Sequence, residues 1–224
     1  MNENIPTPTV EDYLMVIRIM QRDRKPIVGA RLAEWMGVSP PTVSVTLKRM
    51  VRDGWVEVDE EQGVMLTERG EQAAAAVMRR HMLTEHLLAR VLGIPWSLIH
   101  EEAGRLEHTL SDMATERMAH VLNDPVACPH GNPMPGQEAL LDDLTVLAQA
   151  IPGGSWTVVR VDEEAEQNHQ LLDFLERHHL VPGSQVSIVE VMPFNETITL
   201  RSGDSTVVLG LAAARHIHVR PAAS

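Results

Sequence analysis

A cluster of metal-binding residue types occurs in the stretch WSLIHEEAGRLEHTLSD. His100 and Gly104 are four residues apart, and Glu107 and His108 follow His100 by seven and eight residues. On one helix, these spacings place all four residues along the same side. Imidazole and carboxylate groups suit borderline divalent metals such as manganese, iron and zinc. The stretch therefore predicts a metal site on one helical face.

A second ligand pair, His81 and Glu85, lies upstream in RRHMLTEH at i, i+4 spacing, which corresponds to one helical turn. A lone histidine is usually an ordinary surface or core residue. Two neighbouring helices that each present a ligand pair instead favour a shared metal site. The pattern matches neither the HExxH nor the HxxEH signature of zinc peptidases, so it does not indicate a peptidase.

Weaker candidates occur elsewhere in the chain. Cys128 and His130 in ACPHG have CxH spacing, which suits either a soft metal-ligand pair or a plain buried thiol. Asp12 and Met15 lie near the start of an expected helix. An acidic residue there normally complements the helix dipole, and a methionine normally packs in the core. By themselves these residues do not establish a site.

The elements that must position these residues begin with a predicted winged helix-turn-helix. Apolar residues at helical spacing in TVEDYLMVI predict a first helix, and IVGARLAEWMG predicts a second that ends at Gly37. Ser39 is expected to cap a third helix, which runs through TVSVTLKRMVRDG to Gly54. The alternating segments of WVEVDEEQGVMLT flank a Gly-containing turn and predict a hairpin.

The third predicted helix offers side chains that suit the major groove of DNA. Short hydroxyl groups and apolar edges near its N-terminus can contact thymine methyl groups and phosphates, and basic side chains can hold phosphates. The candidate DNA-binding residues are Arg31, Ser39, Pro41, Thr42, Ser44, Thr46, Lys48 and Arg49. The alternative is a winged helix that binds another protein and carries ordinary solvated charges.

The distribution of charge is compatible with DNA binding by the N-terminal segment. The chain has 224 residues and a formal net charge of −12, but residues 1–55 carry +2 and the remainder carries −14. A locally basic segment can bind DNA, although its field is weaker than that of a strongly basic protein.

No feature of the sequence points to a membrane. It has neither a long apolar run nor a basic-then-apolar N-terminal segment, so we expect no membrane partner and no secretion. Cys128, the single cysteine, has no internal partner for a disulfide. These features favour a cytoplasmic protein.

After the predicted hairpin, the chain is expected to be helical at first and then to form mostly short strands. A long helix is expected from Thr67 to Gly93, another from Pro95, and a further helix over 112–122, followed by the loop NDPVACPHGNPMPG. After Ser155, one helix is expected near 167–177, and five short segments are expected as strands, namely SWTVVRV, QVSIVEVM, TITLRS, STVVLG and RHIHVR. Such a module suggests a small β-barrel. The predicted fold class is therefore mainly α with a small β domain.

In combination, these segments resemble the diphtheria-toxin-repressor family of iron- and manganese-dependent transcription regulators. The similar segments, in family order, are TVEDYL, ARLAEWMGVSPPTVSVTLKRMVRDGWVEV, LTERGEQAAAAVMRRHMLTEHLL, IHEEAGRLEHTLSD and HGNPMPG. The last part of the chain is similar to the family's SH3-like (FeoA-like) β-barrel. The resemblance implies a winged helix-turn-helix at 1–75, a helical dimerisation and metal-binding domain at 76–142, a linker at 143–153 and the SH3-like domain at 154–224.

The resemblance implies two metal sites in each subunit. The residues that match ligand positions of the first site are His81, Glu85 and His100, with Glu163 and Glu166 as outer ligands from the SH3-like domain. In manganese-type members, the position of Glu85 instead joins those of Cys128 and His130.

At the second implied site, Asp12, Glu107 and His108 match ligand positions, and Met15 lies nearby in the sequence. Gly104 stands where the family usually has Cys or Glu, and it offers only a backbone carbonyl. Asp12 and the CPH loop favour manganese, a hard ion that accepts carboxylates, although His100 and a full SH3-like domain also occur in iron-type members. We therefore expect a divalent transition metal, Mn(II) in preference to Fe(II).

The resulting hypothesis is a metal-dependent homodimeric regulator that represses metal-uptake or homeostasis genes. It would bind a palindromic double-stranded DNA operator when loaded with metal, and it would have no catalytic residues and no small organic substrate. One alternative is a metallohydrolase, which would need an open coordination position and a base in a pocket. The other is a metal-independent winged-helix regulator whose acidic C-terminal domain binds a protein.

Overall fold

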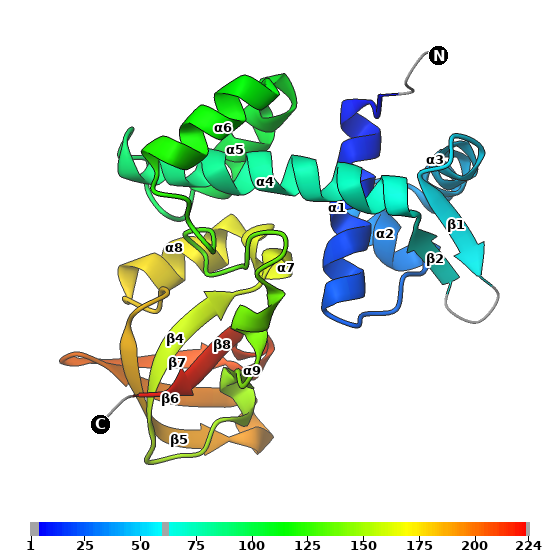
Figure 1. Ribbon diagram of the computed structural model, residues 1–224. Coiled ribbons are helices and arrows are strands. Elements are labelled where there is room, and N and C mark those ends of the chain that lie inside the picture. Colours follow the sequence, from blue (N-terminus) through cyan, green and yellow to red (C-terminus); the bar gives the residue numbers. More distant parts are fainter. Residues whose placement is uncertain (1–4, 60–62, 223–224) are drawn as a thin grey trace. The chain divides into compact units, whose positions relative to one another are not determined.

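The computed structural model describes residues 5–59 and 63–222, and the chain divides into two compact units (Figure 1). The first unit contains residues 1–80 and 107–109, and the second contains residues 81–106 and 110–224. None of the described helices is long and apolar enough to cross a lipid bilayer.

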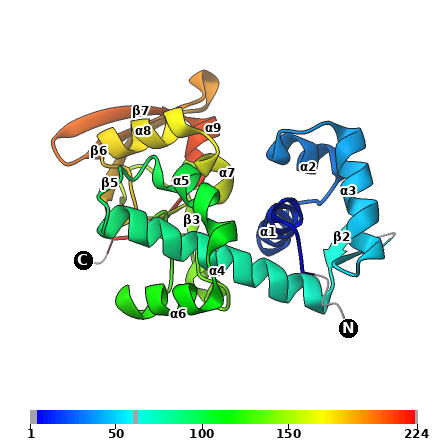
Figure 2. The same ribbon diagram turned by 90° about the horizontal axis from the view of Figure 1, so that it is seen from above.

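The predicted winged helix-turn-helix is present in the first unit. Its elements are α1 (Pro8–Arg22), α2 (Gly29–Met36), α3 (Pro40–Arg52), β1 (Val56–Asp59) and β2 (Gly63–Leu66). Figure 2 looks almost along α1 and shows α2 and α3 beside it. The three helices bury a common core, which includes Leu14, Ile17, Leu32, Val43 and Met50.

Local sequence signals set the ends of these helices. Gly37 ends α2 with a φ of 63°, a left-handed conformation that glycine adopts without strain. Ser39 precedes α3, and its Oγ accepts a hydrogen bond from the backbone N–H of Thr42 at 3.4 Å. The hairpin is also confirmed, since β1 pairs antiparallel with β2, but the part of its turn at 60–62 lies outside the described residues.

The helices that follow are α4 (Glu68–Arg90), α5 (Ile99–Leu106), the 3-10 helix η1 (Glu107–Thr109) and α6 (Asp112–Val121). The prediction of one helix from Pro95 through His108 is wrong at both ends. A turn precedes α5, in which the N–H groups of Trp96 and Ser97 donate to the Glu176 carboxylate at 2.9 and 3.1 Å. At the other end, Glu107 and His108 lie in η1, whose tighter winding breaks the helical spacing used to align them with His100.

The C-terminal part of the second unit contains an antiparallel sheet in which, among the described residues, six strands pair in the order β3-β8-β4-β5-β6-β7. The strands are β3 (Thr145–Val146), β4 (Ser155–Val161), β5 (Gln185–Met192), β6 (Thr197–Ser202), β7 (Ser205–Gly210) and β8 (Ile217–Pro221). The helices are α7 (Glu163–Glu166), α8 (His169–Arg177) and α9 (Leu211–Ala214), with the 3-10 turns η2 (Glu138–Leu141), η3 (Leu147–Gln149) and η4 (Pro193–Asn195).

The alternating pattern located the five longer strands, and α8 matches the predicted helix. The short elements β3, α7 and α9 have too few residues to show a period. No described pairing joins β3 to β7, so closure of the sheet into a barrel is not confirmed.

Candidate metal centres

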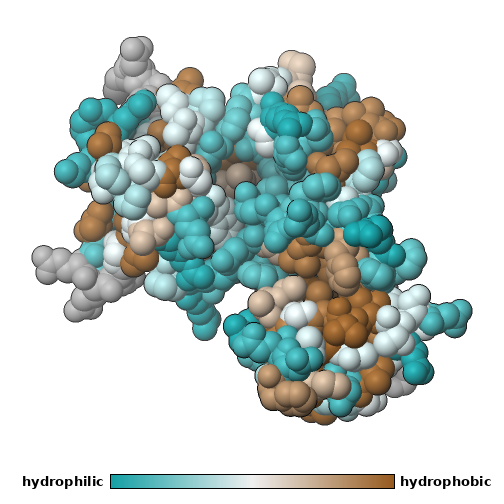
Figure 3. All heavy atoms as spheres, turned by 180° about the vertical axis from the view of Figure 1, so that it is seen from behind, coloured by the Kyte–Doolittle hydropathy of each residue, from teal (hydrophilic) through white to brown (hydrophobic). Residues whose placement is uncertain are grey.

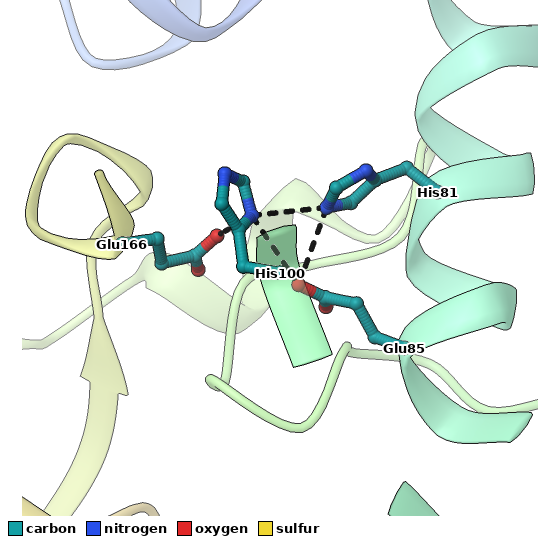
Figure 4. A group of neighbouring side chains, drawn as sticks. All are labelled: His81, Glu85, His100 and Glu166. Carbon is teal, nitrogen blue, oxygen red and sulfur yellow. Dashed lines mark hydrogen bonds and ion pairs between the residues drawn. The ribbon is translucent and has the colours of Figure 1, made fainter. Parts of the chain in front are cut away.

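The first candidate centre is the histidine cluster, which consists of His81, Glu85, His100 and Glu166 (Figure 4). One ligand atom from each residue lies within 4.8 Å of the others. His81 Nε2 lies 3.2 Å from Glu85 Oε1 and 3.0 Å from His100 Nδ1, and His100 Nδ1 lies 2.7 Å from Glu166 Oε2. α4, α5 and α7 thus present two imidazoles and two carboxylates to one point.

The second candidate centre is the cysteine cluster, which consists of Glu85, Cys128, His130 and Glu166, all buried. His130 Nδ1 lies 3.2 Å from Glu85 Oε1 and 3.6 Å from Glu166 Oε1. Cys128 and His130 come from the loop after α6, and Trp96 fixes the far side of the imidazole because its carbonyl accepts from His130 Nε2 at 3.2 Å. Glu85 and Glu166 belong to both clusters.

The ionisable groups of the two clusters strongly perturb one another. Burial alone would lower the pKa of His100, but the carboxylates of Glu166 and Glu85 outweigh burial and raise it to about 9. Burial would raise the pKa of Glu85, yet His130, His100 and His81 hold it well below its usual range. Burial, together with the charges of Glu85 and Glu166, raises the pKa of the Cys128 thiol.

Glu85 Oε2 is buried with no hydrogen-bond partner among the described residues, and the buried His130 Nδ1 has only the ion-pair contacts to Glu85 and Glu166. A buried carboxylate oxygen or imidazole nitrogen needs a hydrogen bond, an ion pair or a bound cation. The donor set of imidazole, carboxylate and thiol is one that a divalent transition metal accepts. The residues present therefore fit a metal ion.

The third candidate centre, in the first unit, is the Asp12 cluster of Asp12, Glu107 and His108. His108 Nε2 lies 3.0 Å from Asp12 Oδ1 and 3.4 Å from Glu107 Oε1. Burial raises the pKa of Asp12, partly offset by His108. This cluster joins α1 of the winged helix-turn-helix to η1.

Glu11, which the sequence did not single out, completes the surroundings of His108. Its Oε2 lies 2.6 Å from His108 Nδ1, and its Oε1 accepts from Arg80 at 2.5 Å. Arg80 also donates to the Glu107 carbonyl at 3.0 Å. Neighbouring helical residues normally point about 100° apart, so the adjacent acidic residues in VEDY gave no signal that Glu11 and Asp12 contact the same imidazole.

One carboxylate expected at a metal site, that of Glu163, is not brought into these clusters. The Glu163 carboxylate instead accepts from the Arg160 guanidinium at 2.9 Å. Gly104 is exposed on α5, with no atom of another element within 4 Å of where a Cβ would lie. Met15 is half-buried on α1, within the helix that carries Asp12.

The face of α3 places most of the candidate DNA-binding residues at the surface. The exposed ones are Ser39, Pro41, Thr42, Ser44, Lys48 and Arg49, whereas Arg31 and Thr46 are half-buried. The hydroxyl groups of Ser39 and Thr42 bond to each other at 2.8 Å, and Thr46 Oγ1 donates to the Thr42 carbonyl at 3.0 Å. Sequence reasoning missed Val45, which is 69% exposed on this face although it is apolar.

Comparison with known families divides the chain into three matched segments. Residues 7–64 match the profile of the iron-dependent repressor N-terminal DNA-binding domain. Residues 67–136 match the metal-binding and dimerisation domain of iron-dependent repressors, and residues 145–221 match the FeoA domain.

Similar proteins span almost the whole chain. The iron-dependent repressor IdeR of Mycobacterium tuberculosis is 36% identical over 219 residues, which cover 89% of this chain and 94% of IdeR. The diphtheria toxin repressor of Corynebacterium diphtheriae is 37% identical over 199 residues, which cover 81% of this chain and 84% of that protein. A solved structure described as a manganese-dependent transcriptional repressor complex with manganese has a TM-score of 0.82 and 31% identity, covering 95% of this chain and all of that one.

Proposed function

This chain belongs to the iron-dependent repressor family, and from that membership we propose that it is a metal-dependent, DNA-binding transcriptional repressor. The observation that carries the proposal is the Asp12 cluster. Its ligand groups come from α1, in the DNA-binding segment, and from η1, in the segment matched to metal binding and dimerisation. A site assembled from these two segments can make the position of α1 depend on metal.

The proposed ligands are the groups that the structure brings together. In the Asp12 cluster, a metal ion would be held by Asp12, Glu107 and His108. In the other two clusters, it would be held by the common carboxylates of Glu85 and Glu166 together with the histidine and cysteine side chains of each cluster. When bound, the metal would supply positive charge to carboxylates that otherwise repel one another. His108 is held with Nε2 towards Asp12, because Glu11 occupies Nδ1.

Manganese is proposed in preference to iron. The Asp12 cluster offers two carboxylates and one imidazole, a hard donor set that suits Mn(II). The cysteine cluster adds a soft thiolate, which Fe(II) also accepts. The related repressors include proteins described as iron-dependent and as manganese-dependent, so the Asp12 donor set is the feature that favours manganese.

Metal would act as a switch through Asp12. The arrangement of α1 that brings the Asp12 carboxylate to Glu107 and His108 gains ligand interactions, and other arrangements do not. Binding therefore favours that arrangement. In the favoured arrangement, α3 would present Ser44, Val45 and Lys48 to the major groove of a palindromic operator.

The proposed active form is a homodimer. In the helical part of the second unit, Figure 3 shows hydrophobic residues gathered near α5 and α6, at the upper right. The exposed apolar side chains of this part are Val91, Leu92, Leu106, Met113, Val121 and Val126. Covering them with a second copy would remove apolar surface from water and would set the spacing of two α3 helices.

A titration of DNA binding with metal tests the proposal. The promoter DNA of a metal-uptake operon would be titrated with protein in excess chelator, with Mn(II) and with Fe(II) under reducing conditions. We expect tight binding with metal, weak binding in chelator, and an affinity that falls with salt because phosphate contacts release counterions. The Asp12→Ala variant should lose the metal response. Equal affinity in chelator and in saturating metal would overturn the proposal.

A further inference from the structure

The chain contains a buried polar network that adjoins the proposed metal clusters, and most of its members belong to none of them. It consists of Asn132, Arg160, Glu163 and Glu166, each at most 5% exposed. Asn132 follows His130 in the loop after α6, Arg160 lies on β4, and the two glutamates lie on α7. Glu166 is the member that also belongs to the histidine and cysteine clusters.

Asn132 holds Glu166 through one end of its amide. Its Nδ2 donates to Glu166 Oε1 at 2.6 Å and to the Val161 carbonyl at 2.9 Å, which uses both amide hydrogens. The opposite oxygen, Glu166 Oε2, lies 2.7 Å from His100 Nδ1. The Glu166 carboxylate is therefore fixed from both sides, by an amide at one oxygen and by an imidazole at the other.

Arg160 fixes the orientation of that amide. Its Nε donates to Asn132 Oδ1 in a very short contact. Arginine has no acceptor and an ionised carboxylate has no donor, so the Asn132 oxygen must face Arg160 and its nitrogen must face Glu166. The loop comes close enough because residue 131 is glycine, where a Cβ would lie 2.0 Å from the Val159 carbonyl.

Glu163 supplies the charge that Arg160 requires. A guanidinium buried without a carboxylate partner is strongly destabilising, and Glu163 Oε2 accepts from Arg160 at 2.9 Å. If Glu163 turned to a metal ion instead, Arg160 would lose this partner. The sequence resemblance placed Glu163 among the metal ligands, but in the structure its carboxylate forms an ion pair with Arg160.

We propose that Glu163, Arg160 and Asn132 form a relay that positions Glu166, with Glu163 acting as the counter-ion of Arg160 and not as a metal ligand. The relay rests on the proposed metal function, because Glu166 matters only if its two clusters bind metal. In this relay Glu163 affects Glu166 only through Arg160 and Asn132. The effects of Glu163 and Asn132 substitutions on metal affinity must therefore be non-additive.

The test uses the full-length protein and Co(II) as the probe, followed by the charge-transfer absorption of a Cys128 thiolate–cobalt bond. Asn132→Leu and Glu163→Gln should each weaken Co(II) binding about tenfold, the lower range for residues that orient ligands. Glu163→Gln should add less than about twofold in the Asn132→Leu background, because the path is already broken. Glu164→Gln, a neighbouring carboxylate on α7, is the matched control and should bind like the wild type.

Asn132→Asp is a second variant of nearly the same volume, and it keeps the test decisive if the leucine variant does not fold. It should also weaken binding, because an acceptor would then face the Glu166 carboxylate. A full additional loss from Glu163→Gln in either Asn132 variant would identify Glu163 as a ligand and overturn the relay. Wild-type affinity in both Asn132 variants would also overturn it. If the wild type gave no Cys128-dependent band, the cysteine cluster would not bind metal and the relay would be overturned, whereas the proposed repressor function, which depends on the Asp12 cluster, would stand.

Discussion

Glu85 places one carboxylate between three imidazoles, those of His81, His100 and His130. In the metal-free protein these contacts are ion pairs whose strength depends on protonation, and a metal ion would compete with the protons for the same atoms. Raising the pH should therefore lower the stability of the metal-free fold while it raises the affinity of these residues for a metal ion.

The first prediction concerns pH. The pKa of His100 is raised to about 9, so its pairing with Glu166 and Glu85 stabilises the fold fully below its unfolded pKa of about 6.5. That stabilisation is lost as the pH rises through about 9. The proposed ligand set requires neutral His100 and ionised Cys128, so Co(II) affinity should rise over the same range.

Thermal melts of chelator-treated protein at pH 6.5, 7.5 and 9, paired with Co(II) titrations, would measure both trends. The His100→Gln variant is the control, because it should show a flatter pH dependence of the melting temperature. A wild-type Co(II) affinity that fell as the pH rose would contradict the assignment of His100 and Cys128 as ligands.

The second prediction concerns Glu11, which we expect to orient His108. Glu11→Ala should weaken Mn(II) binding at the Asp12 cluster about tenfold, because the imidazole loses the partner that fixes its Nε2 towards Asp12. Glu11→Gln keeps an acceptor for Nδ1 and should lose less. Calorimetric titration with Mn(II) would measure the effect.

Glu71→Gln is the matched control for Glu11, because Glu71 is likewise a carboxylate paired with an arginine, Arg18. It should leave Mn(II) affinity unchanged. If Glu11→Ala bound Mn(II) as the wild type does while Asp12→Ala did not, Glu11 would have no positioning role.

At the scale of elements, η1 holds two of the proposed metal ligands, and α3 holds most of the proposed DNA-binding side chains. η1 is a 3-10 helix, and the imidazole of His108 on it lies 3.0 Å from the Asp12 carboxylate. On α3, several hydroxyl groups bond within the helix, so they are already partly satisfied before DNA is present. We therefore expect Ser44, Val45 and Lys48 to contribute more to DNA contacts than Thr46.

The third prediction follows from the exposed face of α3. Val45→Ser should weaken operator binding by about 1 kcal/mol if its methyl groups contact a thymine methyl. Lys48→Ala should weaken binding to all sequences alike and reduce the salt slope by about 1. Fluorescence anisotropy at several salt concentrations would separate the two effects.

Arg177→Ala is a suitable control for this experiment, since Arg177 lies on α8 in the C-terminal segment and pairs with Asp173. Its DNA affinity and salt slope should match those of the wild type. If Val45→Ser and Lys48→Ala also matched the wild type, the recognition surface would not be α3.

At the scale of the whole molecule, the proposed mechanism requires a dimer, because two α3 helices would engage one operator. The fourth prediction is that Met113→Asp with Val121→Asp will convert a dimer to a monomer and abolish operator binding. Both side chains are exposed on α6, eight residues apart and thus on the same side. Sedimentation velocity would measure the mass.

Val208→Asp places the same charge on an exposed apolar position of β7 and should remain dimeric. A dimer that persisted in the α6 double variant would place the interface elsewhere in the chain.

The sequence by itself determined the winged helix-turn-helix, the long strands and most of the side chains that we propose as metal ligands. These features depend on local periodicity, capping residues such as Ser39 and glycine at left-handed positions such as Gly37, all of which act over a few residues. Residues such as His81 and Glu85 were visible for the same reason, because one helical turn relates them.

The tertiary structure decided which of those side chains meet. It placed His108 in a 3-10 helix beside Asp12 and Glu11, and it paired Glu163 with Arg160 while Glu166 joined two clusters. These outcomes depend on where distant segments cross and on which buried charge needs a partner. Neither is encoded by spacing along one helix, because a buried ion pair is set by its neighbours in space.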